Sequence, residues 1–223
     1  MIGRAAVAIW CDVALEVREE FNHWHAHEHM PERLALPGFL RGSRWVADEG
    51  TGYFILYETH SEAAITGPDY IARLNNPTPW SREMMPHHRN MIRGACRIEA
   101  GHGAGLGHAL LSLRFSAQSG KADALSAWLR GTLAAMAKRK GVVATALLRH
   151  IGATRARLTT EQRLRGGDQP PDWVLLINGY SAGALEFSEA ELTAHGALPG
   201  GVTGRYRLAY ILTAYTPPAE ETA

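Results

Sequence analysis

The sequence predicts an α+β protein made of two copies of one six-element unit, and three observations lead to this prediction. Residues 1–100 read in the order strand, helix, strand, strand, helix, strand. Residues 108–217 repeat that order. Glycine occupies every second position of the linker between them, at Gly101, Gly103, Gly105 and Gly107. We therefore expect an N-terminal domain over 1–100 and a C-terminal domain over 108–217.

Hydrophobic periods and turn residues mark the elements of the first unit. A short run rich in Ala, Val, Ile and Trp is typical of a buried strand, and the helical pattern after it ends at Pro37-Gly38. The expected elements are a strand over 4–13, a helix over 15–36, strands over 39–48 and 53–59, a helix over 61–74 that Gly67-Pro68 interrupts, and a strand over 91–100. This is the ferredoxin-like, split βαβ order.

The second unit repeats these elements with one longer connection. The expected elements are a strand over 108–117, a helix over 121–140, strands over 142–151 and 173–180, a helix over 188–195 and a strand over 206–215. The connection over 152–172 is long and basic, and we interpret it as an excursion from the repeated unit.

Charge and composition exclude several classes of partner. The chain has 223 residues, with 23 basic and 22 acidic side chains that are interleaved, so we expect neither nucleic acid nor a membrane surface as partner. No signal peptide and no membrane-spanning run is recognisable. Cys11 and Cys96 are too few for a disulfide framework and lack metal-ligand spacing, which favours a cytoplasmic protein.

The most polar stretch of the chain lies over 21–38 and reads FNHWHAHEHMPERLALPG. On an ideal helix, residues four apart share a flank, which places His25 and His29 on one side. His23 and His27 lie on another side. All four imidazoles therefore cannot converge on one point.

Pro31 interrupts the regular geometry of this stretch. It has no N–H for the carbonyl of His27, and its ring crowds that carbonyl, so we expect a disrupted turn beside His29. The residue before a proline is disfavoured in the αR region, and Met30 is expected to leave it. A disrupted turn can aim the side chain of His29 into a cavity.

The two units differ in chemistry although they share a pattern. When Gly38 is aligned with Gly141, apolar or small residues of the second unit stand opposite the polar residues of the first. His25, His29, Pro31 and Arg33 are matched by Trp128, Thr132, Ala134 and Met136, and Arg41 and Arg44 by Ala144 and Leu147. We interpret the first unit as the working one and the second as its structural partner.

The helix and the strand after it carry a resemblance to a known family. The pattern formed by Trp24, His29, Pro31, Arg33 and Pro37-Gly38-Phe39 resembles the EthD-like and related members of the dimeric α+β barrel superfamily. The resemblance implies that the two units pair, sheet to sheet, into one barrel within this chain, with helices outside. It also implies a ligand pocket between the sheet and the helices of a unit.

Members of that superfamily include cofactor-free monooxygenases, isomerases, haem-dependent dehydratases and chlorite dismutases. No motif of the haem-binding members is recognisable here, so we expect no cofactor. Since fold does not settle function, the residues must indicate the chemistry.

The favoured hypothesis is a cofactor-independent isomerase, lyase or oxygenase that moves a proton on a small cyclic or aromatic, partly anionic metabolite. His29 is the candidate general acid or base, because a neutral imidazole can take and return a proton. Glu28 is a candidate to orient or tune a histidine. Arg44, or Arg41 if the strand is phased the other way, is a candidate to hold an anionic oxygen. The other expected substrate-binding residues are Trp24, His25, Trp45, Tyr57 and Trp80.

Two alternatives remain open from the sequence. One is a metal site at His25 and His29, with Glu32 or His88 as a further ligand; the favoured hypothesis needs no metal. The other is a non-enzymatic module that binds a hydrophobic metabolite.

Arg33 is interpreted as a surface salt bridge, and His87 and His88 as surface loop residues. The expected partner is a small molecule, and a homodimer is compatible with the sequence.

Overall fold

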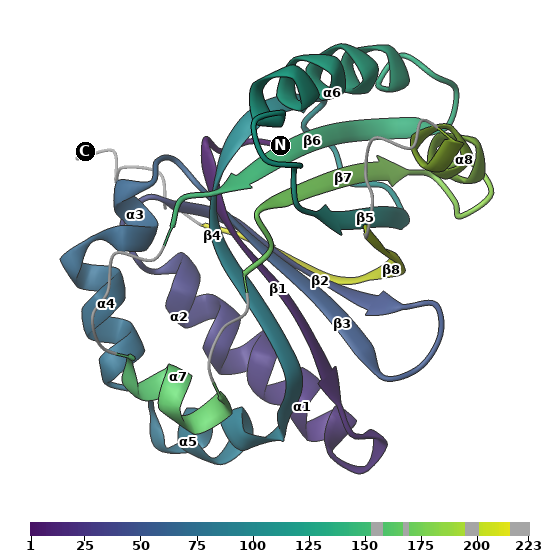
Figure 1. Cartoon of the computed structure of the whole chain (residues 1–223). Coiled ribbons are helices and arrows are strands. Elements are labelled where there is room, and N and C mark those ends of the chain that lie inside the picture. The colour runs from purple at the N-terminus through teal and green to yellow at the C-terminus, as the bar shows by residue number, and fades with distance from the viewer. Residues whose placement is uncertain (153–157, 167–169, 195–200, 215–223) are drawn as a thin grey trace, which may run out of the picture.

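A computed structural model describes residues 1–152, 158–166, 170–194 and 201–214, and within them eight strands close into a barrel (Figure 1). Their order around the barrel is β1-β3-β2-β8-β5-β7-β6-β4. The strands are β1 (Ala5–Val13), β2 (Phe39–Ala47), β3 (Gly52–Thr59), β4 (His88–His102), β5 (Ala109–Phe115), β6 (Val142–His150), β7 (Trp173–Gly179) and β8 (Val202–Thr213).

Two four-stranded sheets of the same topology form this barrel. The first half of the chain gives the order β4-β1-β3-β2, and the second half gives β8-β5-β7-β6. The sheets join at both edges, where β2 pairs with β8 and β4 pairs with β6, all antiparallel. The predicted fold, two ferredoxin-like units closed into a barrel within one chain, is confirmed.

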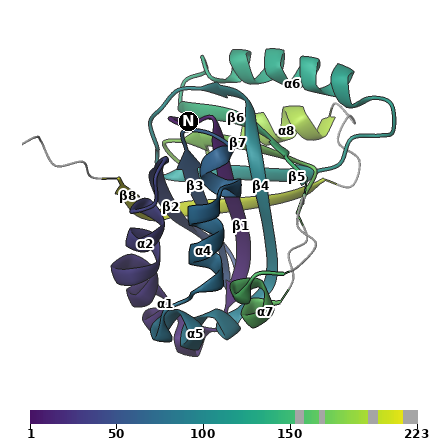
Figure 2. The same cartoon turned by 90° about the vertical axis from the view of Figure 1, so that its left-hand side faces the viewer.

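Helices cover the outside of the barrel in two groups. In both views α1, α2, α4 and α5 lie over the first sheet, and α6 and α8 lie over the second (Figures 1 and 2). The helical segments are η1 (Leu15–Val17), α1 (Arg18–Trp24), η2 (His25–His29), α2 (Met30–Leu34), α3 (Ala63–Thr66), α4 (Pro68–Asn75), α5 (Pro79–Met84), η3 (Met85–His87), α6 (Ala122–Met136), α7 (Thr160–Arg165) and α8 (Glu186–Ala194).

The excursion of the second unit contains α7, which lies against the first unit. It sits beside α4 and η3, and the backbone N–H of Thr160 donates to Oδ1 of Asn75 at the end of α4, at 3.1 Å. A Thr159–Gln162 capping box begins this short helix. The excursion thus brings residues of the second half of the chain to the first sheet.

Three apolar layers hold the fold together. One lies between the first sheet and its helices and includes Phe21, Trp24 and Tyr57. A second lies under α6 and α8. The third fills the barrel and includes Trp10 and Trp45. Because β1 contributes to both the first and the third layer, it is buried on both faces, which explains its continuous apolar run.

Most element boundaries follow the sequence pattern, and the differences have physical causes. The strand expected over 91–100 extends as β4 from His88 to His102, because it pairs first with β1 and then with β6. β8 begins at Val202 rather than at residue 206, because it pairs with β5 from there. The expected helix end at His195 and strand end at Tyr215 lie outside the described residues.

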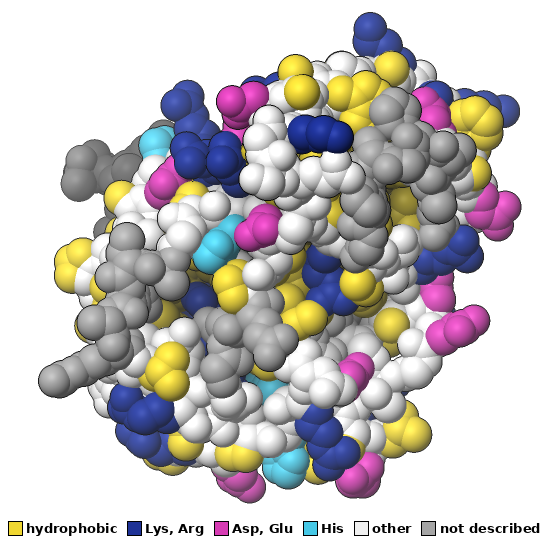
Figure 3. Space-filling model, viewed as in Figure 1, with side chains coloured by type: hydrophobic (Ala, Val, Ile, Leu, Met, Phe, Trp, Pro, Cys, Tyr) yellow, Lys and Arg dark blue, Asp and Glu magenta, His cyan; other side chains and the backbone are white. Residues whose placement is uncertain are grey.

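The face shown in Figure 3 has no single dominant charge, because basic side chains are scattered among acidic and apolar ones on it. None of the described helices combines the length and the apolar character needed to cross a bilayer.

The backbone of the linker between the units lies very close to strand β6. Gly103 has φ +79°, and its carbonyl accepts a hydrogen bond from the amino group of Met1. A Cβ at this position would overlap the carbonyl oxygen of Val143 on β6. Gly120 has a similar φ of +76°, but a Cβ added there would have no neighbour within 4 Å.

This pair of glycines gives a prediction about stability. Gly103→Ala should lower the free energy of unfolding by on the order of 2–4 kcal/mol, because the left-handed backbone and the overlap both oppose it. Gly120→Ala is the control and should lose only about 1 kcal/mol, from the backbone alone. Urea unfolding of both variants measures the difference, and equal losses would show that the linker does not need the close approach.

Candidate functional site

A cavity lies between the outer face of the first sheet and the helices that cover it. The gaps between its lining atoms, together with the open space at its mouth, add up to about 440 Å³. Its position is the one that the resemblance implies. The lining residues are Ile9, His25, His29, Arg33, Ile55, Tyr57, Tyr70, Met85, His88, Met91, Arg93, Glu161 and Arg165.

A π-helical turn from His25 to His29 positions two of the lining histidines. The N–H of Met30 donates to the carbonyl of His25, five residues back, and Pro31 follows in the first turn of α2. The wider turn accommodates the proline without bending the chain away. Met30 therefore stays in the αR region, at φ −68° and ψ −45°, and the expectation that it leaves this region is wrong.

The turn brings the two imidazoles side by side. The ring centroids of His25 and His29 are 5.7 Å apart, and the ring of His29 lies 4.4 Å from that of Trp24. Nε2 of His25 and the hydroxyl of Tyr57 share a hydrogen bond of 3.1 Å. Nδ1 of each histidine is buried and meets no hydrogen-bonding partner among the described residues.

Burial and positive charge keep these imidazoles neutral. Removal from water, followed by the nearby guanidinium of Arg44, lowers the pKa of His25 well below its usual value. Removal from water, followed by the guanidinium of Arg33, lowers the pKa of His29 in the same way. Burial raises the pKa of Tyr57, so its hydroxyl keeps its proton.

A third histidine, His88, also lines the cavity. Burial lowers its pKa to about 4, and its Nδ1 lies 3.0 Å from the carbonyl of Met85. Its ring meets those of Phe21 and Trp24 edge-on. Placing His88 in a surface loop was wrong, because β4 begins at this residue and carries its side chain under the helices.

An ion pair between the two halves of the chain forms part of the lining. Nη2 of Arg33 on α2 donates to Oε1 of Glu161 on α7, and the side chains are 3% and 5% exposed. Arg33 is therefore buried and does not form the surface salt bridge expected from the sequence. Glu161 and Arg165 were not foreseen, because nothing in the basic connection indicates that it folds back onto the first unit.

Other predicted site residues support the cavity wall without lining it. Glu28 accepts hydrogen bonds from Trp24 Nε1 at 3.2 Å and Thr78 Oγ1 at 2.6 Å, so it holds the turn to α5. Trp24 is fully buried behind His29. Arg44 donates to the carbonyl of Asn22 at 3.0 Å and lies over the ring of Tyr210, and it does not line the cavity.

Three of the predicted residues lie elsewhere. Trp45 points into the barrel, where its Nε1 donates to Ser43 at 3.0 Å, because side chains alternate along β2. Arg41 faces the end of the barrel and joins Glu58, at 2.7 Å, to the linker carbonyl of Ala104, at 2.9 Å. Trp80 lies on α5, where its Nε1 donates to Glu20 near the surface. The positions of these three residues do not support a substrate-binding role for them in this cavity.

The geometry does not favour the metal alternative. Within the part of the chain that the structure describes, no three His, Cys, Asp or Glu side chains are grouped closely enough to hold a metal ion. Glu32, one of the further ligands considered, pairs with Arg73 at 3.3 Å.

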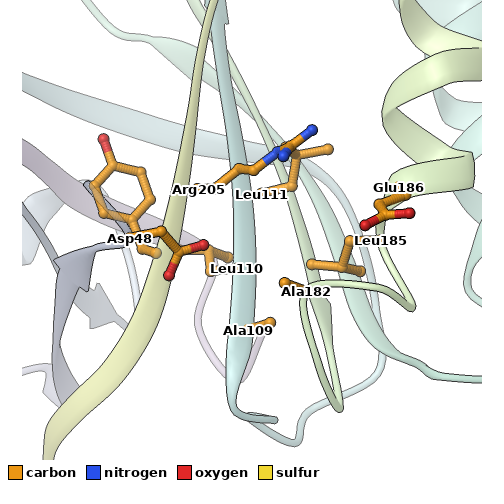
Figure 4. Close-up of a pocket in the computed structure, with 9 residues that line it drawn as sticks. Asp48, Ala109, Leu110, Leu111, Ala182, Leu185, Glu186 and Arg205 are labelled. Carbon is orange, nitrogen blue, oxygen red and sulfur yellow. The ribbon is translucent and has the colours of Figure 1, made fainter.

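A second hollow lies over the second unit and has different chemistry. It lies between β5, β8 and the segment leading into α8, and the gaps between its lining atoms and the open space at its mouth add up to about 230 Å³ (Figure 4). Aliphatic side chains, the ring of Tyr206 and a few charged side chains line it, and no histidine does. Asp48 at its edge already binds Arg207 at 3.0 Å. This hollow lacks an imidazole for proton transfer.

Comparison with known proteins identifies the fold. No family model and no curated protein sequence matches the chain. Among solved structures, a candidate monooxygenase from Fusobacterium nucleatum has a TM-score of 0.65 at 8% identity, over 96% of each chain. An anthrone oxidase-like protein has 0.62 at 14%, over 98% of this chain and 97% of its own. A candidate monooxygenase from Lactobacillus acidophilus has 0.59 at 13%, over 95% and 97%.

At such low identity the likeness concerns the fold. The alignments cover nearly the whole of this chain and of each of these neighbours, so both ferredoxin-like units are shared and not one alone. Their names do not repeat the narrower EthD-like resemblance. The chain thus has the α+β barrel fold that these proteins share.

Proposed function

We propose that this protein is a cofactor-independent enzyme that moves a proton on a small cyclic or aromatic, partly anionic compound. The observation that carries the proposal is the cavity of the first unit, where neutral imidazoles face a lining rich in guanidinium groups. The names of the structural neighbours, a candidate monooxygenase and an anthrone oxidase-like protein, favour the oxygenase branch over an isomerase or a lyase.

His29 is the general base in this proposal. It is 9% exposed and lines the cavity, so a bound compound can reach its ring. Its lowered pKa keeps it free of a proton at neutral pH, although it also makes the imidazole a weak base. An anionic substrate offsets the nearby positive charge and raises the pKa of His29 when proton transfer is needed.

Tyr57 and His25 supply a hydrogen-bond donor for the developing negative charge. Buried N–H groups without partners are rare, so the proton of His25 is best placed on Nε2, where it meets the hydroxyl oxygen of Tyr57. The hydroxyl hydrogen of Tyr57 is then available to the cavity. A neutral donor aimed at an enolate or phenolate oxygen stabilises the product of proton abstraction.

Binding without turnover is the second candidate function. Several polar groups of the lining already have partners within the protein, such as Arg93 with Tyr70 at 2.6 Å and His88 with Met85. A lining of satisfied groups suits a site that holds a compound unchanged. The two functions differ in what the loss of His29 would do.

Proton exchange tests the enzymatic function without knowledge of the final product. Anthrone, a carbon acid with an aromatic frame, should exchange its acidic C–H in D2O faster with the protein than without it. His29→Gln should slow this exchange by roughly 10²–10⁴-fold, because a positioned base contributes about that factor. NMR measures the exchange, and oxygen uptake shows whether oxidation follows.

His27→Gln is the matched control for this experiment, since His27 is exposed on the same turn. It should keep the exchange rate of the unaltered protein. A rate that is the same in His29→Gln and His27→Gln, with anthrone still bound, would reject the base role and support the binding module.

The neutral histidines also predict how stability depends on pH. Below their usual pKa of about 6.5 the unfolded chain binds protons that the folded chain does not. The free energy of unfolding should therefore fall as the pH falls, by about 1 kcal/mol per pH unit for each neutral histidine. For His88 this loss continues down to its folded pKa of about 4.

His88→Gln should make that dependence shallower by about 1 kcal/mol per pH unit between about pH 6 and pH 5. Urea unfolding at several pH values measures the slope, with His27→Gln as the control. A slope that His88→Gln leaves unchanged would mean that His88 takes up its proton at the same pH in the folded and the unfolded protein.

A further inference from the structure

Guanidinium groups outnumber carboxylates among the described residues that line the cavity. Three guanidinium groups, those of Arg33, Arg93 and Arg165, line it together with one carboxylate, that of Glu161. The three lining histidines have lowered pKa values and add no positive charge at neutral pH. Arg33 is the guanidinium whose hydrogen bonds can be followed atom by atom.

Arg33 has a donor that the folded chain leaves unused. Its side chain is 3% exposed, and Nη2 is bonded to Glu161. Nη1 is buried and has no hydrogen-bond partner among the described residues. A buried donor without a partner costs about 1–3 kcal/mol, and more for a charged group, so a ligand that supplies an acceptor there gains this free energy back.

The neighbours of Arg33 limit what that ligand can be. The apolar side chains Ile9, Ile55, Met85 and Met91 line the same cavity, together with the rings of Tyr57 and Tyr70. A ligand must therefore combine a flat or cyclic apolar body with an anionic end. The planar guanidinium suits a carboxylate, whose two oxygens lie in one plane.

We propose that the substrate is an aromatic or cyclic carboxylic acid, that Nη1 of Arg33 binds its carboxylate, and that Nη2 keeps Glu161. This inference rests on the proposed function and names the substrate class of the same site. It also gives the second unit a part in recognition, because α7 supplies the carboxylate that fixes the guanidinium.

Two probes of equal size test the inference on the full-length protein. 2-Naphthoate carries the carboxylate, and 2-naphthamide replaces it with a neutral group of the same shape. Isothermal titration calorimetry at neutral pH and low salt should show that naphthoate binds at least about tenfold more tightly, which is about 1.4 kcal/mol. Equal affinities, or no binding of either probe at millimolar concentration, would overturn the proposal.

The variant Arg33→Gln/Glu161→Gln removes both charges and keeps two side chains that can hydrogen-bond each other. This variant should bind naphthoate at most about twofold more tightly than naphthamide. Arg207→Gln/Asp48→Asn removes an exposed ion pair far from the cavity and is the control, which should keep the preference. A preference that survives the first variant would overturn the role of Arg33.

Glu161→Gln alone is a second, independent variant. It frees the whole guanidinium, so naphthoate should bind more tightly while naphthamide binds as before. An unchanged affinity for naphthoate would contradict the proposal.

2-Naphthyl phosphate is a third probe, with a phosphate in place of the carboxylate. If it binds more tightly than naphthoate, the site takes a phosphate and not a carboxylate. His29→Gln separates this inference from the proposed function, because it should slow proton exchange while naphthoate still binds more tightly than naphthamide.

Discussion

The π-helical turn from His25 to His29 is the constraint on which the candidate site depends. Pro31 cannot donate a backbone hydrogen bond, and a regular helix would crowd its ring against a carbonyl. Widening the turn by one residue removes that conflict and keeps the segment helical. As a result, two imidazoles lie side by side on the cavity, with the ring of Trp24 behind them. Insertions of this kind recur at functional sites in other proteins.

The two halves of the barrel carry unequal shares of the chemistry. Both supply four strands and a helical cover, but among the described residues the layer under α6 and α8 contains no buried histidine or arginine. In the first half, the corresponding layer contains buried histidines and arginines. The second half contributes to that polar layer through α7, whose Glu161 pairs with Arg33. Breaking such a buried pair leaves an uncompensated charge, which makes the pair a strong link between the halves.

Local patterns predicted the fold and the centre of the cavity, whereas long-range contacts decided the rest. Strand periods and the repeat predicted the two ferredoxin-like units, and the family resemblance implied that they close into a barrel. Helix geometry predicted that His25 and His29 share a flank. Arg44, a candidate to hold an anionic oxygen, contacts Asn22 and Tyr210 and does not line the cavity. Glu161 could not be foreseen, because its partner Arg33 lies 128 residues away in the sequence. His88 was missed because burial depends on the helices that cover it.

The central claim is that the folded protein keeps an uncharged imidazole at His29, within reach of a bound anion. NMR of the protein with ¹⁵N-labelled histidine, followed from about pH 8 to pH 5, tests this claim most directly, because the ring nitrogen shifts report protonation. The account predicts that the His29 signals stay those of a neutral ring throughout this range, and that they move toward the protonated form when 2-naphthoate is added. An imidazole that titrates near pH 6.5, and that does not respond to the anion, would contradict the account.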